Sequence, residues 1–259
     1  MTPILSIQNV VKNFDGLAVI RDVTFSVEAG ERVALIGPNG AGKTTLFNLI
    51  TGVYPVTSGS IHVGGQDVTH LADWKRTRHG VIRSFQNIRL MPHLTALENV
   101  MLGQHSRASG FFDQLSPVGL FASNRWRKEA QAVLDEAGLS DYAQELVYNL
   151  PYGVQKRIEL ARAMSARPKL LLLDEPAAGL NSEETEQLTD LLLQLSDSGI
   201  TLVVVEHDMH FVRRLCQHVV VLNFGEKIAE GTPSDIQKNP LVLEAYLGSD
   251  RGLEAGHVS

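Results

Sequence analysis

The chain has little cysteine, no long apolar run and no excess of positive charge. One cysteine, Cys216, among 259 residues excludes an internal disulfide and fits a reducing compartment, and we expect it to be a small buried apolar group. No apolar stretch approaches the ~20 residues of a membrane-spanning helix, and Met1 to Val10 lack the pattern of a secretory signal. The formal net charge of -6 gives no bulk attraction for nucleic acid. We therefore expect a soluble, cytoplasmic protein whose membrane role, if any, comes through a partner.

The hydrophobic pattern predicts an α/β fold. Short β-branched runs separated by turns fill the first part of the chain, and further short strands are expected at Ser60 to Val63 and Val81 to Phe85. Two uninterrupted apolar runs, Leu170 to Asp174 and Thr201 to Asp208, are typical of strands buried on both faces of a parallel sheet. A leucine stripe between these runs predicts a helix, with Asn181 as its N-cap and Glu184 completing a capping box.

A helical insertion interrupts this core. From about residue 90 to residue 166 the apolar spacing is helical, which predicts an inserted helical subdomain. Within it, Gly103 to Asn124 fits no regular element, and we expect a long loop packed onto the insertion. The end of the chain, residues 248–259, is expected to be a flexible tail.

A Gly-rich segment, GPNGAGKTT, matches the phosphate-loop pattern, with a predicted strand before it and a predicted helix after it. The glycines let the backbone turn tightly, so that N–H groups surround phosphate oxygens. Lys43 adds a charge near the β- and γ-phosphates, and the Thr44 hydroxyl is placed to ligate Mg²⁺. The predicted nucleotide-binding residues here are Gly37, Pro38, Asn39, Gly40, Ala41, Gly42, Lys43, Thr44 and Thr45.

Two carboxylates close the first buried apolar run. Asp174 at the end of a parallel strand is well placed to hold Mg²⁺ through water. Glu175 can then orient and deprotonate an attacking water. His207 ends the second run, and we expect it at the same edge of the sheet.

A second anion site is predicted in NLPYGVQKRIELARAM. A helix opens near Gly153, and its free N–H groups and dipole favour negative charge. Its apolar residues recur at helical spacing, whereas Lys156, Arg157, Glu159 and Arg162 fall on other faces.

These motifs, in this order, resemble the nucleotide-binding subunit of an ATP-binding cassette (ABC) transporter. The resemblance covers nearly the whole chain and implies a single ABC nucleotide-binding domain over residues 1–259. Its fold would be a P-loop NTPase (RecA-like) core with an N-terminal antiparallel β region and the helical subdomain at about 90–166. ATP and Mg²⁺ are the implied cofactors.

The resemblance also assigns roles to single residues. Phe14 would stack on the adenine, and Gln86 would contact Mg²⁺ and report on the membrane partner. Asp174 would hold the metal together with Thr44. Glu175 would be the catalytic base, and His207 would touch the γ-phosphate.

The family answers what the second anion site is for. In ABC ATPases the signature helix of one subunit grips the γ-phosphate of ATP held by the other, so that two chains pack head to tail. A loop at Ala178 to Asn181 would join the subunits. The implied partners are a second copy or a close relative, two permease subunits and, indirectly, a periplasmic binding protein, with no nucleic acid. The implied location is the cytoplasmic face of the inner membrane. The signature residues are Leu150, Pro151, Tyr152, Gly153, Val154 and Gln155.

The signature departs from the common family string LSGGQ. Its Pro–Tyr–Gly core resembles the ATPases of branched-chain amino-acid importers and their urea and amide relatives, and the C-terminal segment resembles the longer ATPase of such importers. Val154 stands where Gln is usual, so its contribution to nucleotide contact stays open. Soluble ABC proteins of DNA repair or translation commonly carry two cassettes or long coiled insertions, which this chain lacks. A GTPase would need an Asn-Lys-x-Asp motif, which is absent, and a small-molecule kinase would not explain the signature.

Overall fold

The structure, a computed structural model, describes residues 2–84, 88–107 and 124–246. The predictions for Gln86, for residues 108–123 of the loop expected over Gly103 to Asn124, and for the tail at 248–259 lie outside these residues. At the two ends of that expected loop the prediction was wrong, because Gly103 to Arg107 and Asn124 are helical. Arg107 donates to the distant Ser165 carbonyl at 3.1 Å, a contact that the local sequence does not reveal. The strands are β1 (Leu5–Phe14), β2 (Leu17–Val27), β3 (Arg32–Ile36), β4 (Ser58–Val63), β5 (Gln66–Asp67), β6 (Val81–Arg83), β7 (Leu170–Asp174), β8 (Thr201–Val205), β9 (His218–Asn223) and β10 (Glu226–Gly231). The α-helices are α1 (Lys43–Thr51), α2 (Asp73–Arg78), α3 (Ala96–Gly103), α5 (Asn124–Glu136), α6 (Tyr152–Ser165), α7 (Ser182–Asp197), α8 (Met209–Leu215) and α9 (Pro233–Ile236). Three short 3₁₀ turns are η1 (Gln104–Arg107), η2 (Ser140–Tyr142) and η3 (Val147–Asn149).

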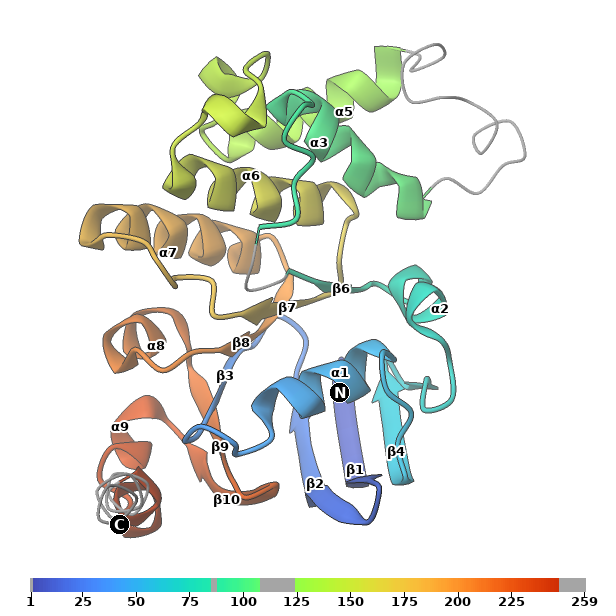
Figure 1. The fold of residues 1–259 in the computed structure, drawn as a ribbon, viewed down its shortest axis with the longest axis vertical. Helices are drawn as coiled ribbons and strands as arrows, with labels where there is room; N and C mark the ends of the chain where they lie inside the picture. The colour runs from blue at the N-terminus through green and yellow to red at the C-terminus, as the bar shows by residue number, and fades with distance from the viewer. Residues whose placement is uncertain (1, 85–87, 108–123, 247–259) are drawn as a thin grey trace, which may run out of the picture.

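Two sheets organise these elements, and they confirm the predicted α/β class. An antiparallel sheet has the order β2-β1-β4-β5, and a second sheet has the order β10-β9-β3-β8-β7-β6. In the second sheet only β10 runs antiparallel to its neighbour. Helix α1 lies between the two sheets in Figure 1.

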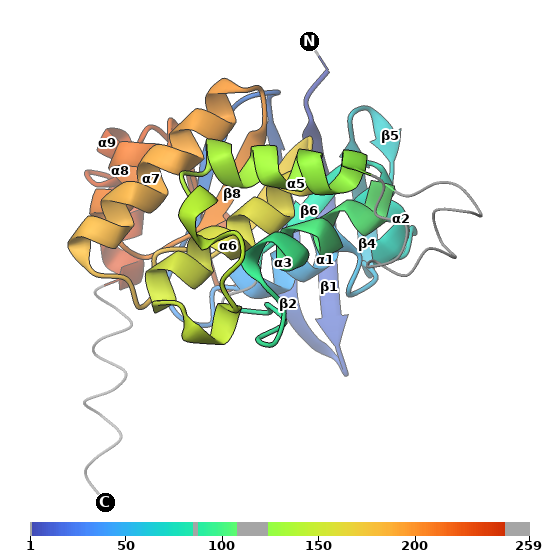
Figure 2. The ribbon, with the colours of Figure 1, turned by 90° about the horizontal axis from the view of Figure 1, so that it is seen from above.

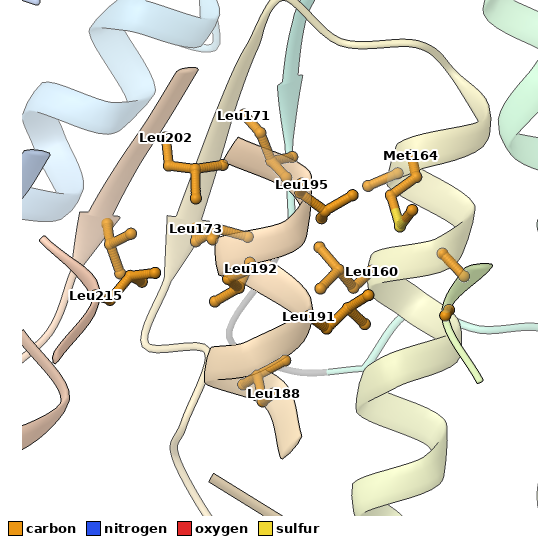
Figure 3. Close-up of a cluster of buried hydrophobic side chains, with 14 of the residues drawn as sticks. Leu160, Met164, Leu171, Leu173, Leu188, Leu191, Leu192, Leu195, Leu202 and Leu215 are labelled. Atoms are coloured by element: carbon orange, nitrogen blue, oxygen red, sulfur yellow. The ribbon is translucent and has the colours of Figure 1, made fainter. Parts of the chain in front are cut away.

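The central strands are apolar throughout because each of their faces packs on a different core. Successive side chains of a strand point to opposite faces, so Leu170 and Leu172 of β7 pack with α1 and the antiparallel sheet. Leu171 and Leu173 pack on the other face, with the helices. Figure 3 shows this second core, where leucines of α7 fill the space between β7, β8 and the apolar side of α6.

Helix α7 begins as predicted. The Asn181 side chain accepts a hydrogen bond from the Glu184 backbone N–H at 3.0 Å, and Glu184 accepts one from the Asn181 N–H at 2.9 Å. This reciprocal pair satisfies two N–H groups that the helix itself leaves free. The predicted capping box is therefore confirmed.

Helices α3, α5 and α6 pack together over the end of the sheet, as Figures 1 and 2 show from two directions. The segment before α3 is held to α6 by two side chains. Glu159 accepts a hydrogen bond from the Arg89 N–H at 3.2 Å, and Arg162 donates to the Arg89 carbonyl at 2.6 Å. Glu159 is buried with this backbone N–H as its donor, and Lys156 of the same helix is buried as well. Two of the four charged residues that the helical spacing put outside the apolar stripe thus lie inside the protein.

Some boundaries differ from the sequence analysis. Strand β8 ends at Val205, so that His207 follows the strand instead of ending it. Strand β6 ends at Arg83. Strands β9 and β10 were not predicted, although the run VVVL in β9 has the same apolar character as β7. Among the described residues, no helix is both long and apolar enough to cross a bilayer.

Cys216 is buried after α8, as expected, and burial raises the pKa of its thiol to about 12. Because the thiolate is the reactive form, we expect no alkylation by iodoacetamide at pH 8 in the folded protein and full alkylation in guanidinium chloride. Mass spectrometry of the two samples measures this. Rapid labelling of the folded chain would contradict the burial.

Candidate nucleotide site

The carboxyl ends of the parallel strands bring the predicted residues to one edge of the sheet. β3 leads into the phosphate loop, β7 ends at Asp174, and β8 leads into His207. β3, β8 and β7 are neighbours in the sheet. In open α/β sheets, ligands bind outside the carboxyl ends of the strands.

The phosphate loop ends at Gly42, which is the N-cap of α1 and has a φ of 100°. L-residues rarely adopt this conformation, and a Cβ on Gly42 would also lie 2.8 Å from Ile20 Cδ1 of β2. No side chain caps α1. Its first N–H groups therefore face the loop, which makes the helix N-terminus an anion site.

Lys43 lies within the curve of this loop. Its ammonium donates to the carbonyl of Gly37 at 2.6 Å and to that of Pro38 at 3.1 Å. Burial lowers the pKa of Lys43, and the carboxylates of Glu175 and Asp174 oppose that shift. The lysine and both carboxylates therefore lie close enough to influence one another electrostatically.

Asp174 has a partner that the sequence analysis missed. Arg83 at the end of β6 donates from Nη2 to Asp174 Oδ2 at 2.5 Å, and both side chains are 8% exposed. The same guanidinium donates from Nη1 to Asn48 Oδ1 at 2.5 Å. No local pattern marks Arg83, because its partners are far away in sequence.

Glu175 has a left-handed backbone, with φ at 47°. A non-glycine residue in this region costs free energy, and such residues cluster at functional sites. The Glu175 N–H donates to the Val205 carbonyl at 2.9 Å, which ties the residue to the end of β8.

His207 lies beside a buried carboxylate that the sequence analysis did not single out. Glu206 accepts hydrogen bonds from the N–H of Ala177 at 3.0 Å and from that of His207 at 3.1 Å. Burial raises the pKa of Glu206, and these hydrogen bonds oppose the shift. The His207 ring is 71% exposed. The hydrogen bond from the His207 N–H to Glu206 therefore holds the His207 backbone in place while its ring stays exposed.

Phe14, the predicted adenine contact, ends β1. Its ring meets Tyr54 edge-on with 5.2 Å between centroids, and the Lys12 ammonium lies 4.7 Å from the Phe14 centroid. Tyr54 is a second aromatic side chain at this position, and the sequence analysis missed it.

The signature segment opens α6 as predicted. Pro151 is the N-cap and provides no side-chain hydrogen bond, and Tyr152 is 45% exposed. The Gln155 side chain donates to the Leu150 carbonyl at 2.8 Å. Val154 packs against the helical core. The N–H groups of the first turn are thus left without a side-chain cap.

The signature helix touches the start of α7 in the same chain. A Cβ on Gly153 would clash with the Glu184 side chain. A Cβ on Gly179, whose φ is 80°, would lie 3.1 Å from Cε1 of Tyr152. At Gly153 the obstacle is the end of a flexible side chain, which can move aside, whereas the positive φ of Gly179 strains any other residue there, independently of any partner.

The donor set at this edge suits Mg²⁺. The Thr44 hydroxyl is exposed on the first turn of α1, and Asp174 supplies carboxylate oxygen. Among the residues that the structure describes, no group of three or more His, Cys, Asp and Glu side chains could hold a metal alone. Mg²⁺ is commonly bound through one or two carboxylates together with substrate phosphates.

Comparisons with known proteins agree with this geometry. Residues 20–178 match the family described as ABC transporter, and residues 226–251 match the family described as branched-chain amino acid ATP-binding cassette transporter. The chain is 42% identical to the high-affinity branched-chain amino acid transport ATP-binding protein BraF of Pseudomonas aeruginosa, covering 95% of this chain and 98% of that protein.

Solved structures agree as well. The ADP conformation of MJ1267, an ATP-binding cassette of an ABC transporter, has a TM-score of 0.86 and 28% identity, with 96% of this chain and 100% of that chain covered. A dimeric post-hydrolysis state of the cassette MJ0796, bound to ADP and phosphate, has a TM-score of 0.74 and 29% identity over 88% of this chain and 98% of that chain.

Proposed function

The chain belongs to the ABC transporter family of ATP-binding proteins, and we propose that it is the ATP-hydrolysing subunit of an importer for branched-chain amino acids. The observation that carries the substrate class is the 42% identity to BraF over nearly the full length of both chains. The match of residues 226–251 to the branched-chain family model supports it from a separate part of the chain. An importer of urea or short amides remains the alternative, because the ATPase does not touch the transported molecule.

The residues divide the work of hydrolysis as follows. The phosphate loop and the N-terminus of α1 hold the β- and γ-phosphates, with Lys43 adding positive charge. Glu175 accepts the proton of a water whose oxygen bonds to the γ-phosphorus while the bond to the ADP oxygen breaks. His207 is placed to contact the γ-phosphate from the end of β8. Bound Mg²⁺, which Thr44, Asp174 and Gln86 would hold, neutralises phosphate charge.

A complete site needs two chains. One chain carries one phosphate loop and one signature, so the uncapped N-terminus of α6 would face the nucleotide of a second subunit. The dimeric form of the MJ0796 cassette supports such a pairing. The loop from Ala178 to Asn181 would lie between the subunits. The partner is a second copy or a closely related ATPase.

A groove between α2, the end of β6 and α6 is the proposed docking site of a permease. It has a volume of about 570 Å³, and Trp74 and Met91 expose about half of their surface beside it. Arg78 is exposed there as well, whereas Glu159, the acidic residue among the described lining residues, is buried and paired with Arg162. An amphipathic helix with an acidic residue fits this combination of apolar and positive surface. The chain would then lie at the cytoplasmic face of the inner membrane, held there by two permease subunits that receive substrate from a periplasmic binding protein.

Lys43→Ala is expected to lower ATP affinity about tenfold to a hundredfold, which corresponds to the loss of a charge-assisted hydrogen bond. The fold should persist, because the Lys43 ammonium donates its hydrogen bonds to the Gly37 and Pro38 carbonyls of its own loop. Calorimetry with Mg²⁺ measures the affinity. Lys238→Ala, which removes the same charge from an exposed site, is the control. Equal ATP affinity in Lys43→Ala and Lys238→Ala would contradict the assignment of the phosphate loop.

Uptake in the source organism tests the substrate class. Deletion of the gene should lower uptake of labelled leucine, isoleucine and valine, and wild-type protein should restore it whereas Lys43→Ala should not. Normal leucine uptake in the deletion strain, with lost uptake of urea or a short amide, would overturn the amino-acid assignment and favour the alternative.

A further inference from the structure

Arg83 is buried where three elements of the nucleotide site meet. It ends β6, and its two terminal nitrogens donate to different elements: Nη2 to Asp174 of β7 and Nη1 to Asn48 of α1, each at 2.5 Å. Its guanidinium carbon also lies 5.7 Å from the centre of the Phe47 ring. One side chain therefore links the strand that leads to Gln86 with the helix of the phosphate loop and with the strand of the metal carboxylate.

The two hydrogen bonds constrain the site because a guanidinium is planar and presents its donors in a fixed fork. A carboxylate is planar too, so holding Oδ2 of Asp174 sets the direction of the other oxygen. Asn48 lies one helical turn after Thr44, on the same face of α1. A bond to Asn48 therefore fixes the part of α1 that carries the Thr44 hydroxyl.

We propose that Arg83 is a positioning residue of the metal site, which holds Asp174 and the Thr44 turn of α1 in the register that lets them share one Mg²⁺. This inference rests on the proposed function, because it takes Asp174 and Thr44 as the protein oxygens at the metal. Arg83 acts through these residues and does not touch nucleotide or metal. Lysine at this position keeps the charge but cannot bridge the two acceptors.

The test is ADP affinity by calorimetry, without Mg²⁺ and at increasing Mg²⁺, in wild-type protein and in Arg83→Lys and Asn48→Ala. ADP is not hydrolysed, so the readout is binding. In both variants, the Mg²⁺ concentration at which ADP affinity reaches its maximum should be about tenfold to a hundredfold higher than in the wild type. Losses of this size are typical when the partner of a metal ligand is removed. ADP affinity without Mg²⁺ should stay at the wild-type value. Asn48→Ala leaves no buried charge unpaired, so it keeps the test valid if Arg83→Lys does not fold.

Two further variants distinguish a failure of the inference about Arg83 from a failure of the metal role of Asp174. Arg125→Ala removes an exposed arginine of α5, outside the nucleotide site and the permease groove, and its Mg²⁺ dependence should be that of the wild type. Asp174→Asn should lose the Mg²⁺ effect. If it does while Arg83→Lys and Asn48→Ala behave as wild type, the inference is overturned and the proposed function stands. If Asp174→Asn itself keeps the full Mg²⁺ effect, the metal role of Asp174 is overturned, and the inference fails with it.

Discussion

Glu175→Gln is expected to bind ATP with wild-type affinity and to turn it over at least about a hundredfold more slowly, because glutamine keeps the size of the side chain but cannot accept a proton. The left-handed backbone at Glu175 is tied to Val205 through its N–H, and the substitution leaves that bond in place. ATP that binds and is not cleaved should hold two chains together. Calorimetry, phosphate release and light scattering of the ATP-bound protein measure the three effects.

Glu136→Gln, the same change at an exposed position of α5, is the control and should hydrolyse ATP at the wild-type rate. Turnover by Glu175→Gln at that rate would mean that Glu175 is not the base. A Glu175→Gln protein that stays monomeric with ATP would leave the base assignment intact but contradict the trapped dimer.

Gly153→Asp is expected to abolish hydrolysis, by at least about a hundredfold, while each chain still binds ATP at its own phosphate loop. An aspartate there adds bulk and negative charge where the N–H groups of α6 would meet a partner's γ-phosphate, and the loss of such donors has effects of this size. Pro151→Ser should be tolerated, since it restores a hydroxyl donor. Binding and phosphate release are measured separately in both variants.

The structure adds a second effect of this substitution that needs its own control. An aspartate at Gly153 would displace Glu184, which belongs to the capping box of α7. Glu184→Ala removes the Glu184 half of that capping box and leaves the Asn181 cap and the signature residues unchanged, at a cost of at most about 1 kcal/mol of stability, and it should hydrolyse ATP normally. If Glu184→Ala is as inactive as Gly153→Asp, the loss comes from α7 and not from a partner's nucleotide.

The parts of the site that could be predicted are those whose functional residues lie next to one another in the sequence. The phosphate loop and the apolar run ending in Asp174 each combine a local pattern with a strand or helix that the same pattern predicts. The capping box of α7 is likewise local, and it was predicted with the correct residues.

The missed residues depend on contacts between distant segments. Arg83 and Asp174 are far apart in sequence and meet only because β6 and β7 are neighbours in the sheet. Lys156 and Glu159 have the polarity of surface residues, and the local sequence does not reveal distant partners such as the Arg89 N–H that donates to the buried Glu159. Strand β10 is a half-exposed edge strand with no apolar run, so its sequence carries little signal. The core of β9 did carry such a signal.

The measurement that tests the account most directly is hydrolysis by a mixture of Lys43→Ala and Gly153→Asp chains. Each variant alone lacks one half of every site and should be inactive. In a head-to-tail dimer that contains one chain of each kind, the intact phosphate loop of the Gly153→Asp chain faces the intact signature of the Lys43→Ala chain. Mixing equal amounts should therefore restore hydrolysis, up to about a quarter of the wild-type rate, because half of the dimers are mixed and each has one intact site. A mixture that stays as inactive as its two components would contradict a site shared between two chains.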